Sequence, residues 1–134
     1  MSINREKIIE LPKIHDKRGN LTFLQNPDSI PFKIKRVFWT YDVPGGEKRG
    51  GHAYKNQEEM VIALSGSLVV VITEKNGSTK RVRLNRSYHG LYLPALTWRH
   101  IENFSPNDLA LHISSQKFDA QDYIREFNTF KSFV

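Results

Sequence analysis

The feature that most constrains the fold is a succession of short strand-like segments, each ended by a turn signal. The segments are rich in β-branched, aliphatic and aromatic residues, and turn signals such as Pro44-Gly45-Gly46 and Asn76-Gly77 separate them. Eight such segments occur: Leu21–Leu24, Ile34–Tyr41, Glu59–Leu64, Leu68–Thr73, Arg81–Leu84, Gly90–Leu93, Trp98–Asn103 and Leu109–Ser114. This pattern predicts an all-β sandwich or barrel of the jelly-roll type.

The C-terminal segment has a different periodicity. Asp119 can cap a helix, and Tyr123, Phe127 and Phe130 then recur at intervals of four and three residues. We therefore expect a short C-terminal helix that begins near Asp119 and packs on the barrel. Asn76-Gly77 predicts a hairpin turn between two strands.

Length and composition limit the possible functions. The 134 residues form one domain, residues 1–134, and the absence of cysteine excludes a disulfide scaffold, a thiolate zinc site and a cysteine nucleophile. The net charge of +6 favours an anionic partner, and because the charges are scattered we expect a phosphate-bearing small molecule rather than nucleic acid. No apolar run has the length of a signal peptide or a membrane span, so we expect a cytoplasmic protein with no membrane partner.

One histidine lies in a setting that suits catalysis. His52 follows Arg49-Gly50-Gly51, and Tyr54 would face the same side of a strand as His52. A histidine, a phenol and nearby cations could bind a phosphate and move a proton near neutral pH. Lone histidines in β proteins are more often structural, so His15, His89 and His112 are interpreted as structural residues.

Two stretches resemble the two motifs of the cupins. The first motif appears as Gly46, His52-Ala53-Tyr54, Glu58 and Gly66; the second appears as Gly90, Pro94, Arg99 and Asn103. Tyr54 and Arg99 stand at two of the four positions that hold the metal in metallocupins. Because arginine stays protonated and repels a cation, and because one histidine with one carboxylate rarely suffices, we predict no metal.

A closer resemblance covers almost the whole chain. In order, the matching segments are Asp16-Lys17-Arg18-Gly19-Asn20-Leu21, Lys35-Arg36-Val37-Phe38, Arg49-Gly50-Gly51-His52-Ala53, Leu64-Ser65-Gly66-Ser67, Gly90-Leu91-Tyr92, Trp98, Asn103-Phe104-Ser105 and Tyr123-Ile124-Arg125 with Phe130-Lys131. Together they resemble the dTDP-4-keto-6-deoxyglucose 3,4-ketoisomerases, the WxcM-like sugar isomerases.

The resemblance implies a metal-free cupin homodimer that exchanges strands between its subunits. Such an isomerase converts a dTDP-4-keto-6-deoxyhexose to its 3-keto isomer by proton transfer through an enediol, without a cofactor. The product is then aminated at carbon 3 for surface glycans such as the O-antigen of lipopolysaccharide. The configuration of the product at carbon 4 and the preference for the nucleotide base are not set by these residues.

The resemblance also implies residue roles. His52 is the catalytic base, and Tyr54 takes the place of the usual second histidine; either His52 makes both transfers while Tyr54 positions the sugar, or the activity is lost or altered. Arg99 is expected near the sugar ring, and Asn103 matches the second motif. The candidates for the pyrophosphate are Arg18, Arg36 and Arg49; those for stacking on thymine are Trp98, Trp39 and Tyr41.

Three alternatives remain open on the sequence alone. The first is a dTDP-sugar 3,5-epimerase, which is also cupin-like and uses a histidine base. The second is a non-catalytic cupin that binds nucleotide sugars, an alternative kept open by Tyr54. The third is a nucleic-acid-binding protein.

Overall fold

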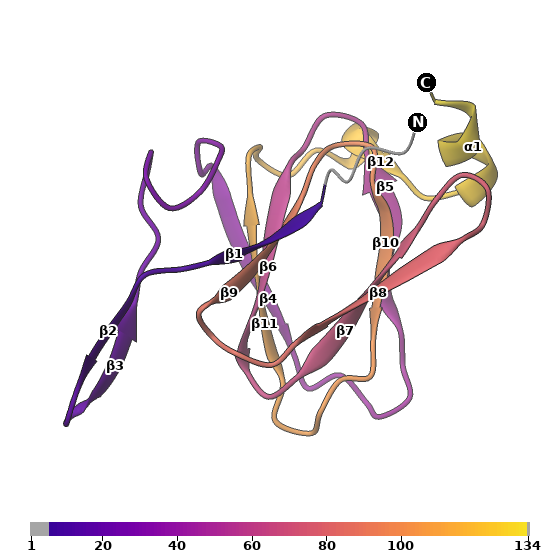
Figure 1. Ribbon diagram of the computed structural model, residues 1–134. Coiled ribbons are helices and arrows are strands. Elements are labelled where there is room, and N and C mark those ends of the chain that lie inside the picture. The colour runs from indigo at the N-terminus through magenta and orange to yellow at the C-terminus, as the bar shows by residue number, and fades with distance from the viewer. Residues whose placement is uncertain (1–5, 134) are drawn as a thin grey trace.

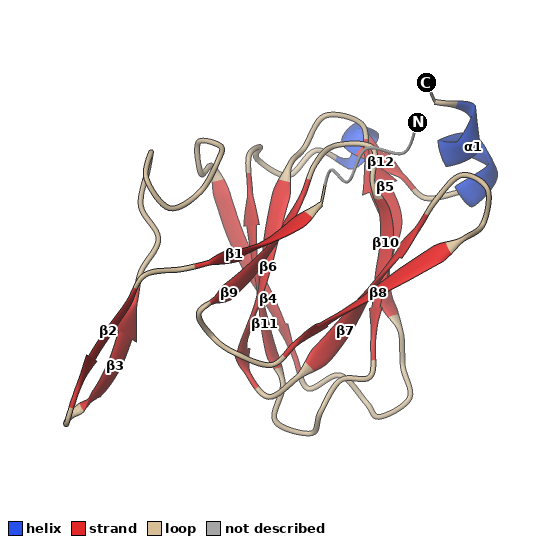
Figure 2. Ribbon diagram, viewed as in Figure 1, coloured by secondary structure: helices blue, strands red, loops and turns tan. Residues whose placement is uncertain are grey.

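The computed structural model describes residues 6–133 and consists mainly of β-strands (Figure 2). Two five-stranded sheets face each other (Figure 1). The first contains, in spatial order, β1 (Lys7–Glu10), β9 (His89–Leu93), β6 (Glu59–Ser65), β11 (Leu109–Ser114) and β4 (Arg36–Tyr41). The second contains β12 (Tyr123–Ile124), β5 (Arg49–Tyr54), β10 (Trp98–Glu102), β7 (Leu68–Thr73) and β8 (Thr79–Leu84).

The strand pairs are nested. Strand β7 pairs with β8, β6 with β9, β5 with β10 and β4 with β11, all antiparallel. This is the arrangement of one long antiparallel ribbon wound into a jelly roll. The all-β, cupin-like prediction is confirmed.

The core lies between the two sheets. Alternate residues of β7 point inward, and Leu68, Val70 and Ile72 are at most 2% exposed. They pack with Val61 of β6 and with Leu93 of β9, so both sheets contribute to one apolar cluster. Burial of this surface, at about 25 cal/mol per Å², is the main force that holds the sheets together.

Most predicted strands form, including the hairpin at Asn76-Gly77, where Gly77 has a φ of 89°. The predicted strand Leu21–Leu24 is shifted: β3 (Gly19–Thr22) ends earlier, and Leu24 instead packs against the outer face of the first sheet. β3 pairs with β2 (Lys13–Asp16), and this hairpin projects from the barrel (Figure 1).

The C-terminal helix begins later than predicted. Asp119 caps only the 3₁₀ turn η1 (Ala120–Asp122), Tyr123 lies in β12, and the helix α1 spans Phe127–Ser132. The physical reason is Asp122, whose carboxylate accepts hydrogen bonds from backbone N–H groups beside β5 and draws the segment into the sheet. Among the described residues, no helix combines the length and the hydropathy required to cross a bilayer.

Replacing Gly66, in the turn between β6 and β7, should destabilise the fold strongly. Its φ is +70°, and an added Cβ would overlap the Ser105 hydroxyl and lie 3.0 Å from the Cα of Asp108. The Ser105 hydroxyl also accepts a hydrogen bond from the Ser67 N–H at 2.9 Å. We expect Gly66→Ala to lower the free energy of unfolding by about 2 kcal/mol or more, as measured by denaturant titration.

The matched control is Gly77→Ala. Gly77 also has a positive φ, +89°, but an added Cβ would meet no atom within 4 Å. Gly77→Ala should therefore lower the free energy of unfolding only through backbone strain, by about 1 kcal/mol. Equal losses in the two variants would contradict the steric argument for Gly66.

Candidate active site

A cavity of about 260 Å³ lies between the two sheets. Its apolar base is shared with the core, through Val61, Val70, Leu93 and Ile101. Its polar lining comes from both sheets and from the C-terminal segment: Arg49, His52, Tyr54, Glu59, Arg99, His112, Tyr123 and Arg125. The cavity is therefore enclosed by strands that are fixed by the core below it.

The strand geometry accounts for these positions. His52 and Tyr54 lie two residues apart on β5 and both line the cavity, as the sequence predicted. The register of β10 against β5 pairs Arg99 with His52, which brings the guanidinium into the same cavity. Tyr123 pairs with Tyr54 through β12.

His52 has the properties of a free base. Its ring lies against the rings of Tyr54 and Tyr123, at centroid distances of 4.7 and 5.1 Å. Its Nε2 atom is buried, and no group among the described residues hydrogen-bonds to it. Burial, together with the positive charge of Arg99, lowers the pKa of His52 to about 3. The imidazole is therefore neutral at physiological pH, with a lone pair available in the cavity.

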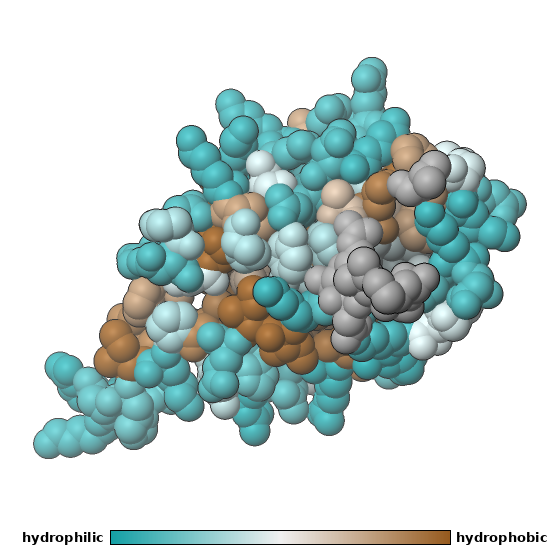
Figure 3. Space-filling model, turned by 45° about the horizontal axis from the view of Figure 1, so that its top comes forward, coloured by the Kyte–Doolittle hydropathy of each residue, from teal (hydrophilic) through white to brown (hydrophobic). Residues whose placement is uncertain are grey.

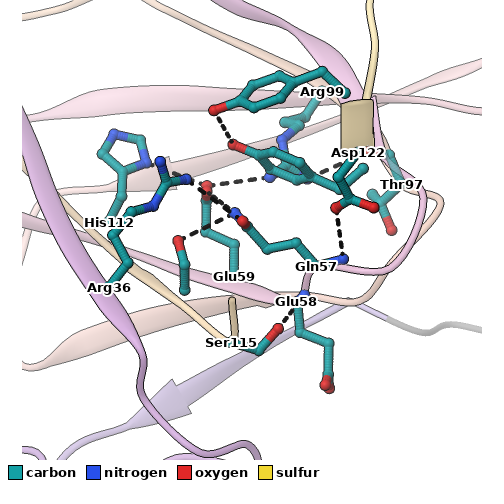
Figure 4. A network of polar contacts seen from close by, with 12 residues as sticks. Arg36, Gln57, Glu58, Glu59, Thr97, Arg99, His112, Ser115 and Asp122 are labelled. Carbon is teal, nitrogen blue, oxygen red and sulfur yellow. Dashed lines mark hydrogen bonds and ion pairs between the residues drawn. The ribbon is translucent and has the colours of Figure 1, made fainter. Parts of the chain in front are cut away.

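A buried charged cluster lies beside His52. Oε1 of Glu59 is 3.2 Å from Nη2 of Arg99 and 3.2 Å from Nδ1 of His112 (Figure 4). Burial alone would raise the pKa of Glu59, but the charge of Arg99, with the contribution of His112, lowers it to about 2. Glu59 is thus a carboxylate, and the cation that faces it is a guanidinium.

The carboxylate that lines the cavity is one residue later than the motif predicts. The motif places its glutamate at Glu58, but the Glu58 side chain accepts a hydrogen bond from the Tyr92 hydroxyl and is absent from the cavity lining. Glu59 has the opposite side-chain direction on the strand and lines the cavity. A shift of one residue along a strand exchanges the two faces of the sheet. Among residues 6–133, no group of three His, Asp or Glu side chains could hold a metal ion.

A hydrogen-bonded network fixes the segment before Glu59 (Figure 4). The carboxylate of Asp122 accepts from the backbone N–H of Asn56 at 2.9 Å and of Gln57 at 3.0 Å. The Gln57 amide donates to the hydroxyl of Ser114 at 3.1 Å and accepts from Arg36 at 3.4 Å. These contacts attach the C-terminal segment to the β5–β6 connection and so position Glu59.

Tyr54 is a buried phenol. Its hydroxyl donates to that of Tyr123 at 3.3 Å, and the guanidinium of Arg99 lies 4.7 Å from its ring centre. Burial, reinforced by the charge of Glu59, raises the pKa of Tyr54 well above its ordinary value. The phenol therefore keeps its proton and acts as a hydrogen-bond donor, not as a base.

Two arginines stand at the mouth of the cavity. Arg49 and Arg125 both line it and both are exposed to solvent. The guanidinium of Arg125 also lies 4.3 Å from the ring centre of Tyr123. Exposed guanidinium groups at the rim of a cavity suit a phosphate or pyrophosphate group.

The structure brings together four of the predicted site residues, namely Arg49, His52, Tyr54 and Arg99. Two others lie elsewhere in this chain: Arg18 is in the projecting hairpin, paired with Asp16 at 2.9 Å, and Asn103 is exposed after β10. Arg36 is close to the cavity but supports Gln57 instead of lining it.

The predicted stacking residues are also placed outside the cavity lining. Trp98 packs against Phe127 and Phe130 of α1, at centroid distances of 5.4 and 5.8 Å. Trp39 and Tyr41 point outward from β4 and are 57% and 61% exposed. The outward direction follows from alternation along β4, in which Arg36 and Phe38 turn inward.

Sequence reasoning missed four lining residues: Glu59, His112, Tyr123 and Arg125. The available signal was a polar residue at an inward position of an apolar strand, as for Glu59 and His112. Charged side chains are rarely buried unless they are paired, and buried polar groups almost always have hydrogen-bond partners. Tyr123 and Arg125 carried no such signal, because their contacts with the cavity arise from the path of the C-terminal segment.

Comparison with known proteins identifies the family of the chain. Residues 4–134 match the family described as FdtA: WxcM-like, C-terminal. The chain is 34% identical over 128 residues to the TDP-4-oxo-6-deoxy-alpha-D-glucose-3,4-oxoisomerase of Aneurinibacillus thermoaerophilus, covering 96% of this chain and 91% of that protein.

Solved structures of similar proteins have the same fold. The WlaRB TDP-quinovose 3,4-ketoisomerase from Campylobacter jejuni is 37% identical with a TM-score of 0.90, over 96% of this chain and 98% of that one. The 3,4-ketoisomerase QdtA from Thermoanaerobacterium thermosaccharolyticum, solved in complex with TDP, is 31% identical with a TM-score of 0.93, over 97% and 94%. The chain therefore belongs to the FdtA, WxcM-like C-terminal family.

Proposed function

We propose that this protein is a sugar-nucleotide 3,4-ketoisomerase, which converts a dTDP-4-keto-6-deoxyhexose to the corresponding 3-keto sugar. The observation that carries the proposal is the neutral imidazole of His52, whose buried Nε2 atom has no hydrogen-bond partner among the described residues and which lines a cavity rimmed by arginines. The relatives named above, all more than 30% identical, are 3,4-ketoisomerases or oxoisomerases.

The proposed reaction needs a base of this kind. The hydrogen on carbon 3 is acidic because it is adjacent to the ketone at carbon 4. His52 removes it to give an enediol and then returns a proton to carbon 4. The buried guanidinium of Arg99 and the phenol of Tyr54 stabilise the negative charge that develops on the sugar oxygens. The reaction requires no redox cofactor, because the sugar is oxidised at one carbon and reduced at the other.

The nucleotide part of the substrate would bind at the mouth. Arg49 and Arg125 suit the pyrophosphate, because two exposed guanidinium groups can each make paired hydrogen bonds to phosphate oxygens. Arg36 acts indirectly, through Gln57. Tyr54 retains its proton and orients the sugar, which supports the version of the mechanism in which His52 makes both carbon proton transfers.

We also propose a homodimer with exchanged strands. The β2–β3 hairpin pairs only with itself among the described residues, and an isolated two-stranded hairpin is marginally stable. Hydrophobic residues gather at the surface between this hairpin and the barrel (Figure 3). A hollow of about 780 Å³ lies there, lined by Leu64 and Leu111 among others. A second copy of the chain would cover this face and the outward-pointing Trp39 and Tyr41 of β4.

The hairpin would then carry Arg18 toward the cavity of the other subunit, where its charge could reach the pyrophosphate. Trp98 would contribute by packing against α1, which follows Tyr123 and Arg125 in the chain, and Asn103 by its place after β10, the strand that carries Arg99. The 3-amino sugar pathway for surface glycans and the cytoplasmic location remain predictions from the resemblance.

Isotope exchange tests the isomerase directly. In deuterated buffer, we expect proton NMR of dTDP-4-keto-6-deoxyglucose with the wild-type protein to show loss of the carbon 3 signal and formation of a 3-keto product. His52→Asn should lower the rate by at least about 10²-fold, because the base is removed. The proton coupling at carbon 4 of the product gives its configuration.

The other outcomes identify the alternatives. Exchange at carbon 5 as well would indicate a 3,5-epimerase. Binding of dTDP without any exchange would indicate a non-catalytic protein and would contradict the proposal. Melting temperatures of the wild type and His52→Asn control for loss of folding.

The pH dependence should also be unusual for a histidine base. Because the pKa of His52 is lowered from 6.5 to about 3, the base stays unprotonated on acidification. We expect kcat/KM to show no decline attributable to this base between pH 8 and pH 5, as measured by initial rates. A fall in kcat/KM on acidification with an apparent pKa near 6.5 would contradict the low pKa of His52 if that apparent pKa changes when residues around His52 are substituted.

Acid also lowers stability, and the two effects must be separated. Below pH 6.5 the unfolded chain binds a proton at His52 and the folded chain does not. The free energy of unfolding therefore decreases as the pH is lowered. Glu59 acts in the same direction below pH 4.5, because its folded pKa is about 2. Rates should therefore be compared only where circular dichroism shows the native state.

Subunit mixing tests the exchanged hairpin. His52→Asn and Arg18→Ala should each lower kcat/KM when assayed alone. If Arg18 serves the partner's cavity, each mixed dimer contains one site with both wild-type residues. Statistical exchange of equal amounts should then restore about a quarter of the wild-type activity. No gain on mixing, with exchange verified by mass, would show that both residues serve the same chain's site.

A further inference from the structure

A second histidine lines the cavity and has no part in the mechanism above. His112, interpreted from the sequence as structural, is 6% exposed, and alternation along β11 turns it inward with Ala110 and Ser114. Of the imidazole nitrogens in residues 6–133, only Nε2 of His52 and Nε2 of His112 are buried without a hydrogen-bond partner. Both residues line the same cavity. A buried, unpartnered nitrogen is rare in proteins and is available to a ligand.

The rest of the His112 ring is held firmly. Nδ1 lies 3.2 Å from Oε1 of Glu59 (Figure 4). The ring stacks on Phe38 with centroids 4.5 Å apart and an angle of 4° between the planes. Glu59 is a carboxylate and can only accept, so Nδ1 is the donor and carries the proton in the neutral ring. The Nε2 lone pair is then free, and the carboxylate also stabilises the imidazolium that forms when Nε2 takes a proton.

The isomerisation moves two protons, one between carbons and one between oxygens. The hydrogen of carbon 3 goes to carbon 4, and the hydroxyl proton of oxygen 3 must be replaced by one on oxygen 4. His52 accounts for the carbon transfer. Tyr54 is poorly suited to the oxygen transfer, because its hydroxyl donates to Tyr123 and its pKa is raised. The reaction therefore calls for a second group that can both give and take a proton.

We propose that Nε2 of His112 carries the proton between the two sugar oxygens, an inference that rests on the proposed isomerase function. As His52 takes the carbon 3 proton, the C3=C4 bond forms and oxygen 4 becomes negatively charged. Nε2 of neutral His112 then takes the proton of oxygen 3 and passes it to oxygen 4. As the C3=O bond forms from the deprotonated oxygen 3, His52 returns its proton to carbon 4. Both imidazoles then regain their starting states.

The test compares carbon exchange with product formation in His112→Asn. The asparagine amide can take the place of Nδ1 toward Glu59, but it has no counterpart of Nε2. We expect product formation to fall by about 10²-fold or more, with dTDP affinity unchanged. Because His52 still removes the carbon 3 hydrogen, deuterium should enter carbon 3 of the remaining substrate faster than product forms, raising that ratio above the wild-type value.

His100→Asn is the matched control. His100 also pairs with a carboxylate, Glu102, at 2.7 Å, but it is absent from the cavity lining. This variant should keep wild-type turnover. Wild-type turnover in His112→Asn, or an equal fall of exchange and product formation, would overturn the role of His112. A wild-type protein that converts no substrate would overturn the isomerase function itself, and the role of His112 with it.

A measurement on the unsubstituted protein covers the case in which His112→Asn fails to fold. With ¹⁵N-labelled histidine, saturation with the unreactive analogue dTDP-glucose should shift the Nε2 resonances of His52 and His112 and leave that of His100 unchanged. An unchanged His112 resonance, with that of His52 shifted, would overturn the proposal.

Discussion

The interaction on which the site depends is the buried contact of Glu59 with Arg99 and His112. Glu59 and His112 belong to the first sheet and Arg99 to the second, so the cluster links the two sheets across the lining of the cavity. A buried charge is costly when unpaired, and removing one partner of such a pair costs about 3–5 kcal/mol. The three side chains therefore have to be retained together, each satisfying the others.

The same cluster sets the protonation states around it. Burial, together with the positive charge of Arg99, lowers the pKa of His52, and the same charge outweighs burial to lower the pKa of Glu59. The carboxylate therefore stays charged while the imidazole of His52 stays neutral. A neutral imidazole is a base, and the Glu59 carboxylate accepts a hydrogen bond from Nδ1 of His112.

The fold was largely predictable, because turn residues and alternating apolar residues act locally. Leu68–Thr73 forms the predicted strand without a change of bounds. The errors arose where a long-range contact overrides local preference: Asp122 binds the backbone before β6, and Tyr123 therefore joins a sheet rather than a helix. The Glu58 assignment failed for a related reason, since a motif gives spacing but the strand register decides which of two adjacent carboxylates faces inward.

The sequence by itself determined the succession of strands, the position of His52 with Tyr54 two residues later, and the resemblance to sugar 3,4-ketoisomerases. These depend on the order and spacing of residues along one strand. Only the tertiary structure decided that Glu59, His112 and Arg125 share the cavity with His52, and that Trp98 packs beneath the C-terminal helix. The physical reason is that these side chains come from strands distant in sequence, and their meeting depends on sheet register and barrel closure rather than on any local pattern.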